Sequence, residues 1–117
     1  LDFQDGILTA HNHLTEQPPG PVDAVTGAAM LVDGELWREL DGMDLAYQSG
    51  YEDIDFCLRA TELVPSCVWY EPTTTIVHHE SQSGPARWAH VSENIALLHG
   101  RWADRYAPDH VDGAHPR

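Results

Sequence analysis

The chain is poor in positive charge and in cysteine. Only 6 of its 117 residues are lysine or arginine, against 19 aspartates and glutamates, so its formal net charge is −13. Proteins that bind nucleic acid need basic patches facing the phosphates, so we expect no nucleic-acid partner. Attraction to anionic lipids is disfavoured for the same reason. Two cysteines, Cys57 and Cys67, do not make a disulfide framework, which favours ordinary buried thiols in a cytoplasmic protein.

Long apolar runs and phosphate-binding glycine motifs are also absent from the sequence. No stretch approaches the roughly 18 apolar residues of a membrane-spanning helix. No segment has the glycine-rich spacing that cradles phosphates, so we expect any nucleotide to be gripped by residues outside this sequence. What is present is 42% hydrophobic residues, in a length that suits one compact domain.

The segment from Ser49 to Leu63 has the pattern of an amphipathic helix. Ser49 and Glu52 have capping-box spacing, which predicts that the helix begins there. At about 100° per residue, its apolar side chains form one broad face and most of its charged side chains form the other. Asp55 and Arg59 stand four residues apart on the charged face, so we expect an exposed ion pair of little energetic value.

Asp53 is the exception to this pattern, because it falls near the middle of the apolar face. A carboxylate that faces inward loses hydration and needs hydrogen-bond donors or a cation. Free N–H groups and the positive dipole end of the helix supply part of that stabilisation. Asp53 is therefore either a helix-start device or a reactive group, and helix geometry alone favours neither interpretation.

The remaining segments show a mixture of strand and helix patterns. The sequence predicts a short strand near residues 3–8, a buried strand or strand pair at 22–33, a short helix within 34–43, and β-rich segments at 67–72 and 73–79. A long helix is predicted from Pro85 to about Tyr106, because its apolar residues form a narrow stripe at helical pitch. The stripe consists of Trp88, Val91, Ile95, Leu98, Trp102 and Tyr106. Residues 108–117 are expected to be a flexible tail.

Two pairs of histidines raise the possibility of a metal site. His11 and His13 would face the same way as alternate residues of a strand, although loop histidines without partners are more often surface groups. His78 and His79 close the segment at 73–79. Because adjacent strand residues point to opposite faces, at most one of these two faces any one site, unless the strand ends there.

Five motifs occur in a fixed order along the chain. They are TGAAMLV at 26–32, DGMD at 41–44, GYEDIDFCLR at 50–59, VWYEP at 68–72 and IVHHESQSG at 76–84. Together they resemble the second half of a family-two glycosyltransferase of the GT-A fold, closest to the rhamnosyltransferase-like group. The resemblance covers about residues 22–106. It implies an α/β fold over residues 1–107: the acceptor-side portion of a GT-A mixed sheet, with flanking helices and a long C-terminal amphipathic helix.

The resemblance also implies roles for individual residues. Asp53 matches the catalytic base of the family. His78 matches the histidine associated with the divalent metal and the diphosphate, and His79 is the alternative because the doublet leaves the register open. The positions that the resemblance places near the substrates are Thr26, Gly27, Glu52, Ser81 and Ser83.

The reaction implied by the resemblance is a single inverting displacement by a hexosyltransferase. Asp53 takes the proton of an acceptor hydroxyl as that oxygen attacks the anomeric carbon of a nucleotide sugar. A divalent cation, Mg²⁺ or Mn²⁺, neutralises the departing nucleoside diphosphate. The acceptor is a saccharide or a lipid-linked glycan of cell-surface polysaccharide synthesis. The expected location is the cytoplasm, or the inner face of the membrane through parts outside these residues.

The chain departs from the family pattern in its loops and in its extent. Asp41 stands where the family usually has glycine, Leu45 replaces a glutamate, and Pro65-Ser66 replaces a glycine–aromatic pair. The resemblance leaves out the family's nucleotide-binding first half, with its Asp-x-Asp metal motif. We therefore expect these 117 residues to be inactive alone. We also expect a sheet edge and apolar surface to be left uncovered, so that the chain self-associates by edge pairing or helix exchange. Two alternatives stay open: a non-catalytic binding or assembly module of the same shape, and a small histidine-based metal-binding protein.

Overall fold

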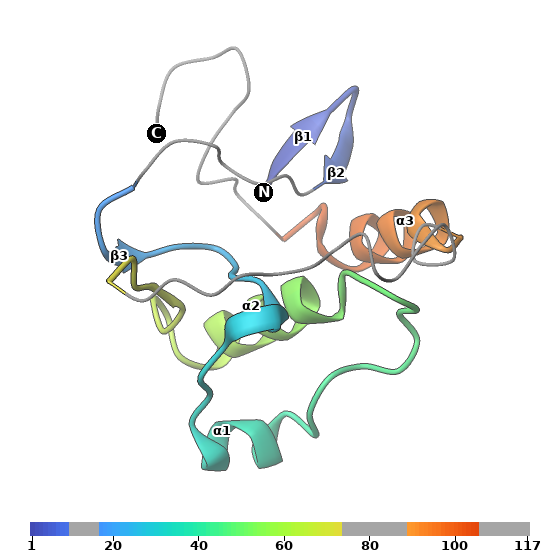
Figure 1. Ribbon diagram of the computed structural model, residues 1–117. Helices are drawn as coiled ribbons and strands as arrows, with labels where there is room; N and C mark the ends of the chain where they lie inside the picture. The colour runs from blue at the N-terminus through green and yellow to red at the C-terminus, as the bar shows by residue number, and fades with distance from the viewer. Residues whose placement is uncertain (10–16, 74–88, 106–117) are drawn as a thin grey trace.

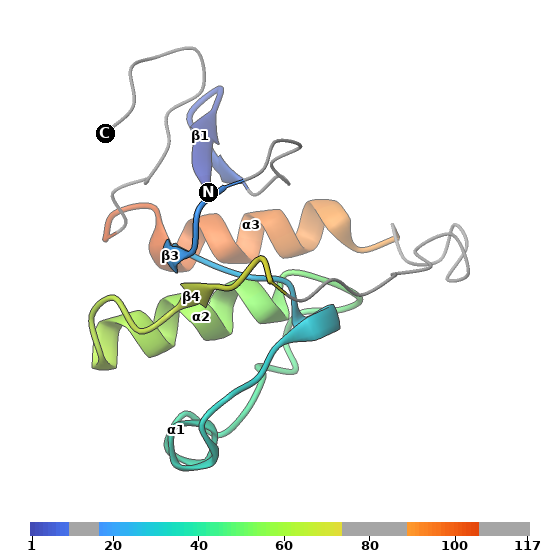
Figure 2. The same ribbon diagram turned by 60° about the vertical axis from the view of Figure 1, so that its left-hand side comes forward.

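The computed structural model describes residues 1–9, 17–73 and 89–105. In this part the chain forms a small mixed α/β arrangement. Its elements are β1 (Asp2–Gln4), β2 (Ile7–Thr9), β3 (Gly20–Pro21), the 3₁₀ turn η1 (Gly27–Ala29), α1 (Gly34–Glu39), α2 (Glu52–Leu63), β4 (Trp69–Tyr70) and α3 (Val91–Trp102). Figure 1 shows α1 set apart from the remaining elements. Figure 2 shows the order of the layers: the β1–β2 hairpin, then α3, then α2, then α1.

Both sheets of the described part are two-stranded and antiparallel. In the first, Phe3 of β1 stands opposite Leu8 of β2. Asp5 and Gly6 between these strands have positive φ values of 52° and 80°, as the two central residues of a type I′ hairpin turn do. The expected strand near residues 3–8 is therefore two short strands, and the Asp-Gly pair is the signal that separates them.

The second sheet is shorter than the sequence pattern predicted. Gly20 of β3 stands opposite Tyr70 of β4, and the N–H of Val22 donates to the carbonyl of Val68 at 2.9 Å. β4 lies within the predicted segment at 67–72. The segment predicted at 73–79 lies almost wholly outside the described residues.

The prediction of a buried strand at residues 22–33 was wrong. The segment follows an open path along α2, turns once at η1, and leaves the side chain of Leu31 fully exposed at 102%. A strand is buried only where a neighbouring strand and a second layer cover it. In the described part of the chain, no strand pairs with this segment beyond Val22.

The core lies between the hairpin, α2 and α3. Its buried hydrophobic residues are Leu1, Leu8, Tyr47, Leu58, Leu98 and Trp102. The N–H of Leu8 donates to Nδ1 of His99 at 3.0 Å, which fixes the hairpin to α3. The helix expected within 34–43 is present as α1, where the Asp33 carboxylate caps the N–H of Leu36 at 3.1 Å. Among the described residues, no helix has the length and apolar character needed to cross a membrane.

The helix α3 is shorter than the predicted span of 85–106. Residues 89 and 90 form a turn, and the helix begins at Val91 and ends at Trp102. Leu98 and Trp102 of the predicted stripe are buried, as expected, and Asn94 is buried beside them at 3% exposure. Trp88 and Tyr106 lie outside the described residues, as does the expected tail at 108–117.

Candidate functional site

Asp53 lies in the first turn of α2 and points toward the η1 turn. Its Oδ2 accepts a hydrogen bond from the N–H of Gly27 at 2.7 Å, and its Oδ1 accepts one from the N–H of Ile54 at 2.8 Å. The side chain is partly buried rather than enclosed in the core. Asp53 therefore faces η1, and backbone donors supply the stabilisation that the carboxylate needs.

Gly27 and Thr26 shape the turn that meets Asp53. A Cβ atom added at Gly27 would lie only 3.2 Å from the Cβ of Asp53, so a larger residue there would push against the carboxylate-bearing side chain. The Thr26 hydroxyl accepts the N–H of Ala28 at 3.2 Å and caps the turn. The structure thus brings together three residues that the motif resemblance had placed at one site.

The chain reaches α2 through a turn in an unusual conformation. Ser49, Gly50 and Tyr51 have φ values of 56°, 144° and 69°, in succession. The helix begins at Glu52, so the prediction that Ser49 caps it was wrong: a residue with left-handed φ three positions earlier does not offer its hydroxyl to the first turn. The Glu52 carboxylate accepts the N–H of Gly50 at 2.9 Å, which leaves this predicted substrate-binding residue engaged with the backbone.

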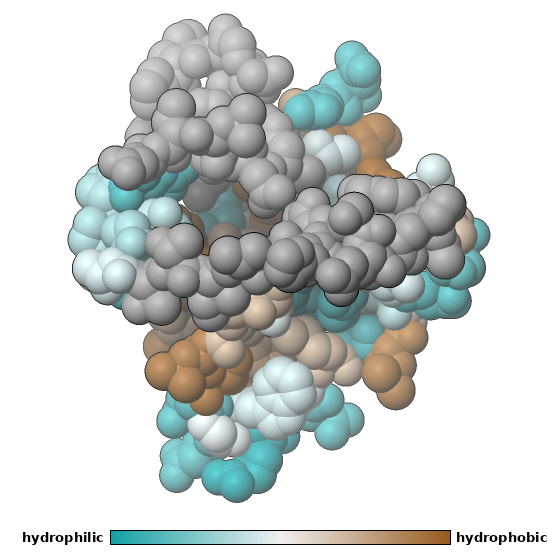
Figure 3. All heavy atoms as spheres, viewed as in Figure 1, coloured by the Kyte–Doolittle hydropathy of each residue, from teal (hydrophilic) through white to brown (hydrophobic). Residues whose placement is uncertain are grey.

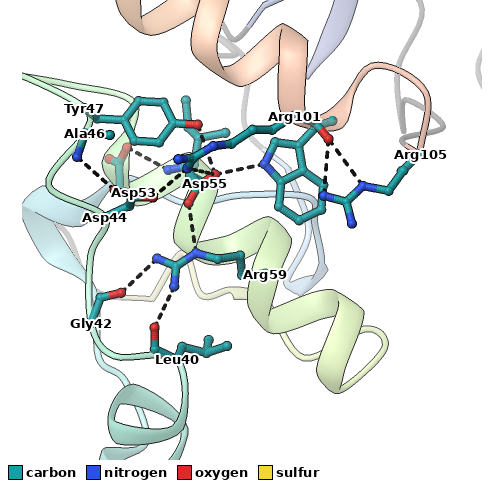
Figure 4. Close-up of polar contacts among 12 residues, drawn as sticks. Leu40, Gly42, Asp44, Ala46, Tyr47, Asp53, Asp55, Arg59, Arg101 and Arg105 are labelled. Carbon is teal, nitrogen blue, oxygen red and sulfur yellow. Dashed lines mark hydrogen bonds and ion pairs between the residues drawn. The ribbon is translucent and has the colours of Figure 1, made fainter.

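Asp55 is completely buried, which corrects the prediction of an exposed ion pair with Arg59. Its carboxylate accepts hydrogen bonds from the Tyr47 hydroxyl at 3.0 Å, from Nε1 of Trp102 at 2.9 Å and from Nε of Arg59 at 2.8 Å (Figure 4). Arg101 adds a contact at 3.5 Å. The prediction failed because it assigned the faces of the helix by hydropathy alone. In the structure, α3 packs against this side of α2 and places the indole of Trp102 and the guanidinium of Arg101 next to Asp55.

The two arginines around Asp55 also hold the loop between α1 and α2. Arg59 donates to the carbonyl oxygens of Leu40 at 2.7 Å and Gly42 at 2.8 Å. Arg101 pairs with Asp44 at 2.6 Å, and the Ala46 N–H and this arginine together lower the pKa of Asp44. Burial, followed by the charge of Asp55, raises the pKa of the Tyr47 hydroxyl well above its usual range, so this phenol remains a donor. Asp55 thus has a structural role, because its carboxylate links α2 to α3 and to the loop before α2.

Asp53 and Asp55 have Asp-x-Asp spacing but do not form a metal site. Residues two apart on a helix point in different directions. Asp53 faces η1, while Asp55 faces α3 and is fully occupied by donors. Within the residues that the structure describes, no group of three histidine, cysteine, aspartate or glutamate side chains is placed to hold a metal ion.

Several predicted site residues fall outside the described residues. These are His11 and His13, the candidate metal pair, and His78, His79, Ser81 and Ser83, which the resemblance places near a diphosphate and its metal. Their assignments stay predictions, as does the distance between Asp53 and either histidine of the doublet.

An open cleft runs beside the turn that holds Asp53. Its volume is about 1650 Å³, and its lining combines the segment 22–33 with apolar residues of α2, the loop after it and β4. Thr26 and Gly27 are part of that lining. Figure 3 shows apolar side chains reaching the surface above α1. A second depression of about 860 Å³ includes Asp41 and Leu45.

Asn94 is the residue that the sequence interpretation missed. A polar side chain in a helix is usually solvent-exposed, so Asn94 was not included in the predicted apolar stripe. Its spacing of four from Leu98 and eight from Trp102 was the available signal, because these positions share one face of a helix. The Asn94 amide bonds the backbone of Gln48, just before the unusual turn.

No protein-family model, no curated protein and no solved structure matches this chain.

Proposed function

We propose that this chain is the acceptor-side part of an inverting glycosyltransferase, with Asp53 as the general base. The observation that carries the proposal is the carboxylate of Asp53, which is partly buried at the start of α2 and oriented by the Gly27 N–H at 2.7 Å. The glycine allows the turn to approach closely. This arrangement agrees with the role that the motif resemblance implies for Asp53, Thr26 and Gly27.

The hydrogen bonds of Asp53 leave room for catalysis. A carboxylate has about four acceptor positions on its two oxygens, and each oxygen here accepts one backbone N–H. The remaining positions are available to an acceptor hydroxyl within hydrogen-bond reach. In the proposed reaction the hydroxyl proton passes to Asp53 as its oxygen bonds to the anomeric carbon, and the bond from that carbon to the nucleoside diphosphate breaks. The two N–H donors hold the carboxylate in one orientation throughout.

The nucleotide-sugar donor and its cation would be bound largely by residues outside the described part. A divalent cation would neutralise the charge of the departing diphosphate. The described residues contain no cluster of three potential ligands, so His78 or His79, which lie beyond them, are the proposed contributors from this chain. The proposed acceptor is a saccharide or lipid-linked glycan, bound on the side of Thr26 and Gly27.

The test is Asp53→Asn in the complete enzyme that contains this chain. Transfer should fall by roughly 10²–10⁴-fold, because the amide accepts no proton, while donor binding by calorimetry stays unchanged. Product nucleoside diphosphate can be measured with a panel of nucleotide sugars, since the donor sugar is not specified. Glu62→Gln is the matched control, because this carboxylate also lies on α2 and pairs with Arg105 at an exposed position. Retention of near-normal transfer by Asp53→Asn would rule out its role as the base.

The apolar side chains exposed along the large cleft favour a second candidate, a non-catalytic binding or assembly module. Leu31 is fully exposed and Trp69 is 54% exposed beside the cleft, as in surfaces that another polypeptide covers. The same Asp53→Asn variant distinguishes the candidates, since an assembly module would keep its partner and show no transfer in either form.

A further inference from the structure

We propose that Asn94 of α3 is a positioning residue that holds the turn before α2 and thereby sets the orientation of Asp53. The catalytic meaning of this proposal rests on the function proposed above, whereas the structural link does not. Three consecutive residues, Ser49, Gly50 and Tyr51, have positive φ. Side chains at two of them are strained in this region, so the conformation persists only if surrounding contacts impose it.

Asn94 supplies such contacts from one side of the turn. Its side chain is 3% exposed, its Nδ2 donates to the carbonyl oxygen of Gln48 at 2.6 Å, and its Oδ1 accepts the N–H of Gln48 at 3.0 Å. One amide therefore satisfies both backbone groups of the residue preceding the turn. An aspartate could only accept, and a leucine could do neither. A Cβ atom added at Gly50 would lie 3.9 Å from the Asn94 Nδ2, so the amide also lies against the turn itself.

Glu52 holds the turn from the other side. Its carboxylate accepts the Gly50 N–H at 2.9 Å, while the Tyr51 carbonyl accepts the first N–H of the helical ladder, from Asp55, at 3.0 Å. The turn is thus fixed between α3 and the first turn of α2. Asp53 lies two residues beyond Tyr51, so a change in this turn moves the start of the helix and the carboxylate that meets Gly27.

The experiment measures hydrogen exchange and the amide chemical shift of Gly27 by NMR on the full chain. The Gly27 N–H donates to Asp53, so its protection reports the orientation of that carboxylate. Asn94→Ala and Asn94→Asp should each speed Gly27 exchange at least about tenfold relative to the exchange of core amides in α3. Asn94→Gln keeps both hydrogen-bonding functions and should restore part of the protection. Ser92→Ala, at an exposed position of α3, is the control.

Leu98→Ala separates positioning from general loosening of α3. This variant removes a fully buried core side chain, so it should lower protection throughout the core without a selective effect on Gly27. If Asn94→Ala does not fold, the nearly isosteric Asn94→Asp decides. Unchanged Gly27 exchange and chemical shift in the folded Asn94 variants would overturn the proposal.

A second measurement keeps this proposal distinct from the proposed function. In the complete enzyme, Asn94→Asp should lower kcat at least about tenfold with little change in donor KM, because the base is displaced while the donor site is not. Loss of Gly27 protection together with an active Asp53→Asn enzyme would refute the catalytic function and leave the structural link standing. An inactive Asp53→Asn enzyme with intact Gly27 protection in the Asn94 variants would refute the link alone.

Discussion

Asp55→Asn tests whether one buried carboxylate joins α2, α3 and the loop before α2. The substitution keeps the shape of the side chain but replaces one acceptor oxygen by an amide that donates. That amide would face donors on Tyr47, Trp102 and Arg59, which all lie within 3.0 Å of the carboxylate oxygens. At least one donor therefore loses its acceptor inside the protein.

The magnitude follows from the burial of the groups. Removing one partner of a buried ion pair costs about 3–5 kcal/mol. Arg59 is 23% exposed and keeps its bonds to two backbone carbonyls, so the lower part of this range applies. We expect a loss of about 3 kcal/mol in the free energy of unfolding, from a total of about 5–15 kcal/mol. For a domain of this size, the melting temperature should fall by roughly 10 °C.

The assay is urea unfolding monitored by far-UV circular dichroism, a signal that no single tryptophan dominates. Glu62→Gln is the control: its partner Arg105 lies 2.9 Å away, and the two side chains are 49% and 53% exposed. That exposed pair should contribute less than about 1 kcal/mol. Equal losses for Asp55→Asn and Glu62→Gln would show that the buried junction does not stabilise the fold.

Four other outcomes are expected. Under the proposed function, Gly27→Ala should lower transfer while the melting temperature changes little, because the new Cβ would lie 3.2 Å from the Cβ of Asp53. Burial raises the pKa of Cys57 from 9.0 to about 11. Between pH 9 and 10 the unfolded chain releases this thiol proton while the folded protein keeps it, so the free energy of unfolding should fall as the pH rises over that range. His99→Ala should cost about 1–3 kcal/mol and speed exchange of the Leu8 amide, which loses its acceptor. The isolated chain should self-associate in sedimentation experiments, because apolar side chains line its open cleft.

For each of these predictions, one result would contradict it. Normal transfer by Gly27→Ala would show that Asp53 tolerates displacement. A urea midpoint that declines equally between pH 9 and 10 in Cys57→Ala would assign the pH dependence to other groups. Unchanged Leu8 exchange in His99→Ala would mean that packing alone holds the hairpin. A monomer at high concentration would contradict self-association through the cleft.

Local signals in the sequence predicted the helices better than their ends. The apolar periodicity located α2 and α3, but the start of α2 depends on three residues with positive φ, and Ser49 and Tyr51 are not residue types that indicate such a conformation. The capping-box pattern was therefore misleading. The hairpin was predicted as one strand, although its Asp5-Gly6 pair is a strong turn signal.

Long-range polar contacts were beyond the reach of periodicity. Asp55 was assigned to the exposed face because helical periodicity depends on the residue type alone. Its buried partner, the indole of Trp102, lies 47 positions away in the sequence. Asn94 was missed for the same reason, since its partner is the backbone of a loop 46 positions away. Asp53 was singled out because its placement on the apolar face was anomalous, and its contact with Gly27 explains how that placement is stabilised.

The arginines that surround Asp55 have a consequence for the outside of the molecule. Arg59 and Arg101 both direct their guanidinium groups toward acids and carbonyls between α2, α3 and the preceding loop. In a chain with only 6 basic residues, this leaves few cations to offset the acids that face solvent. This net negative charge therefore opposes the predicted self-association at low ionic strength, and added salt should favour it by screening the repulsion between molecules.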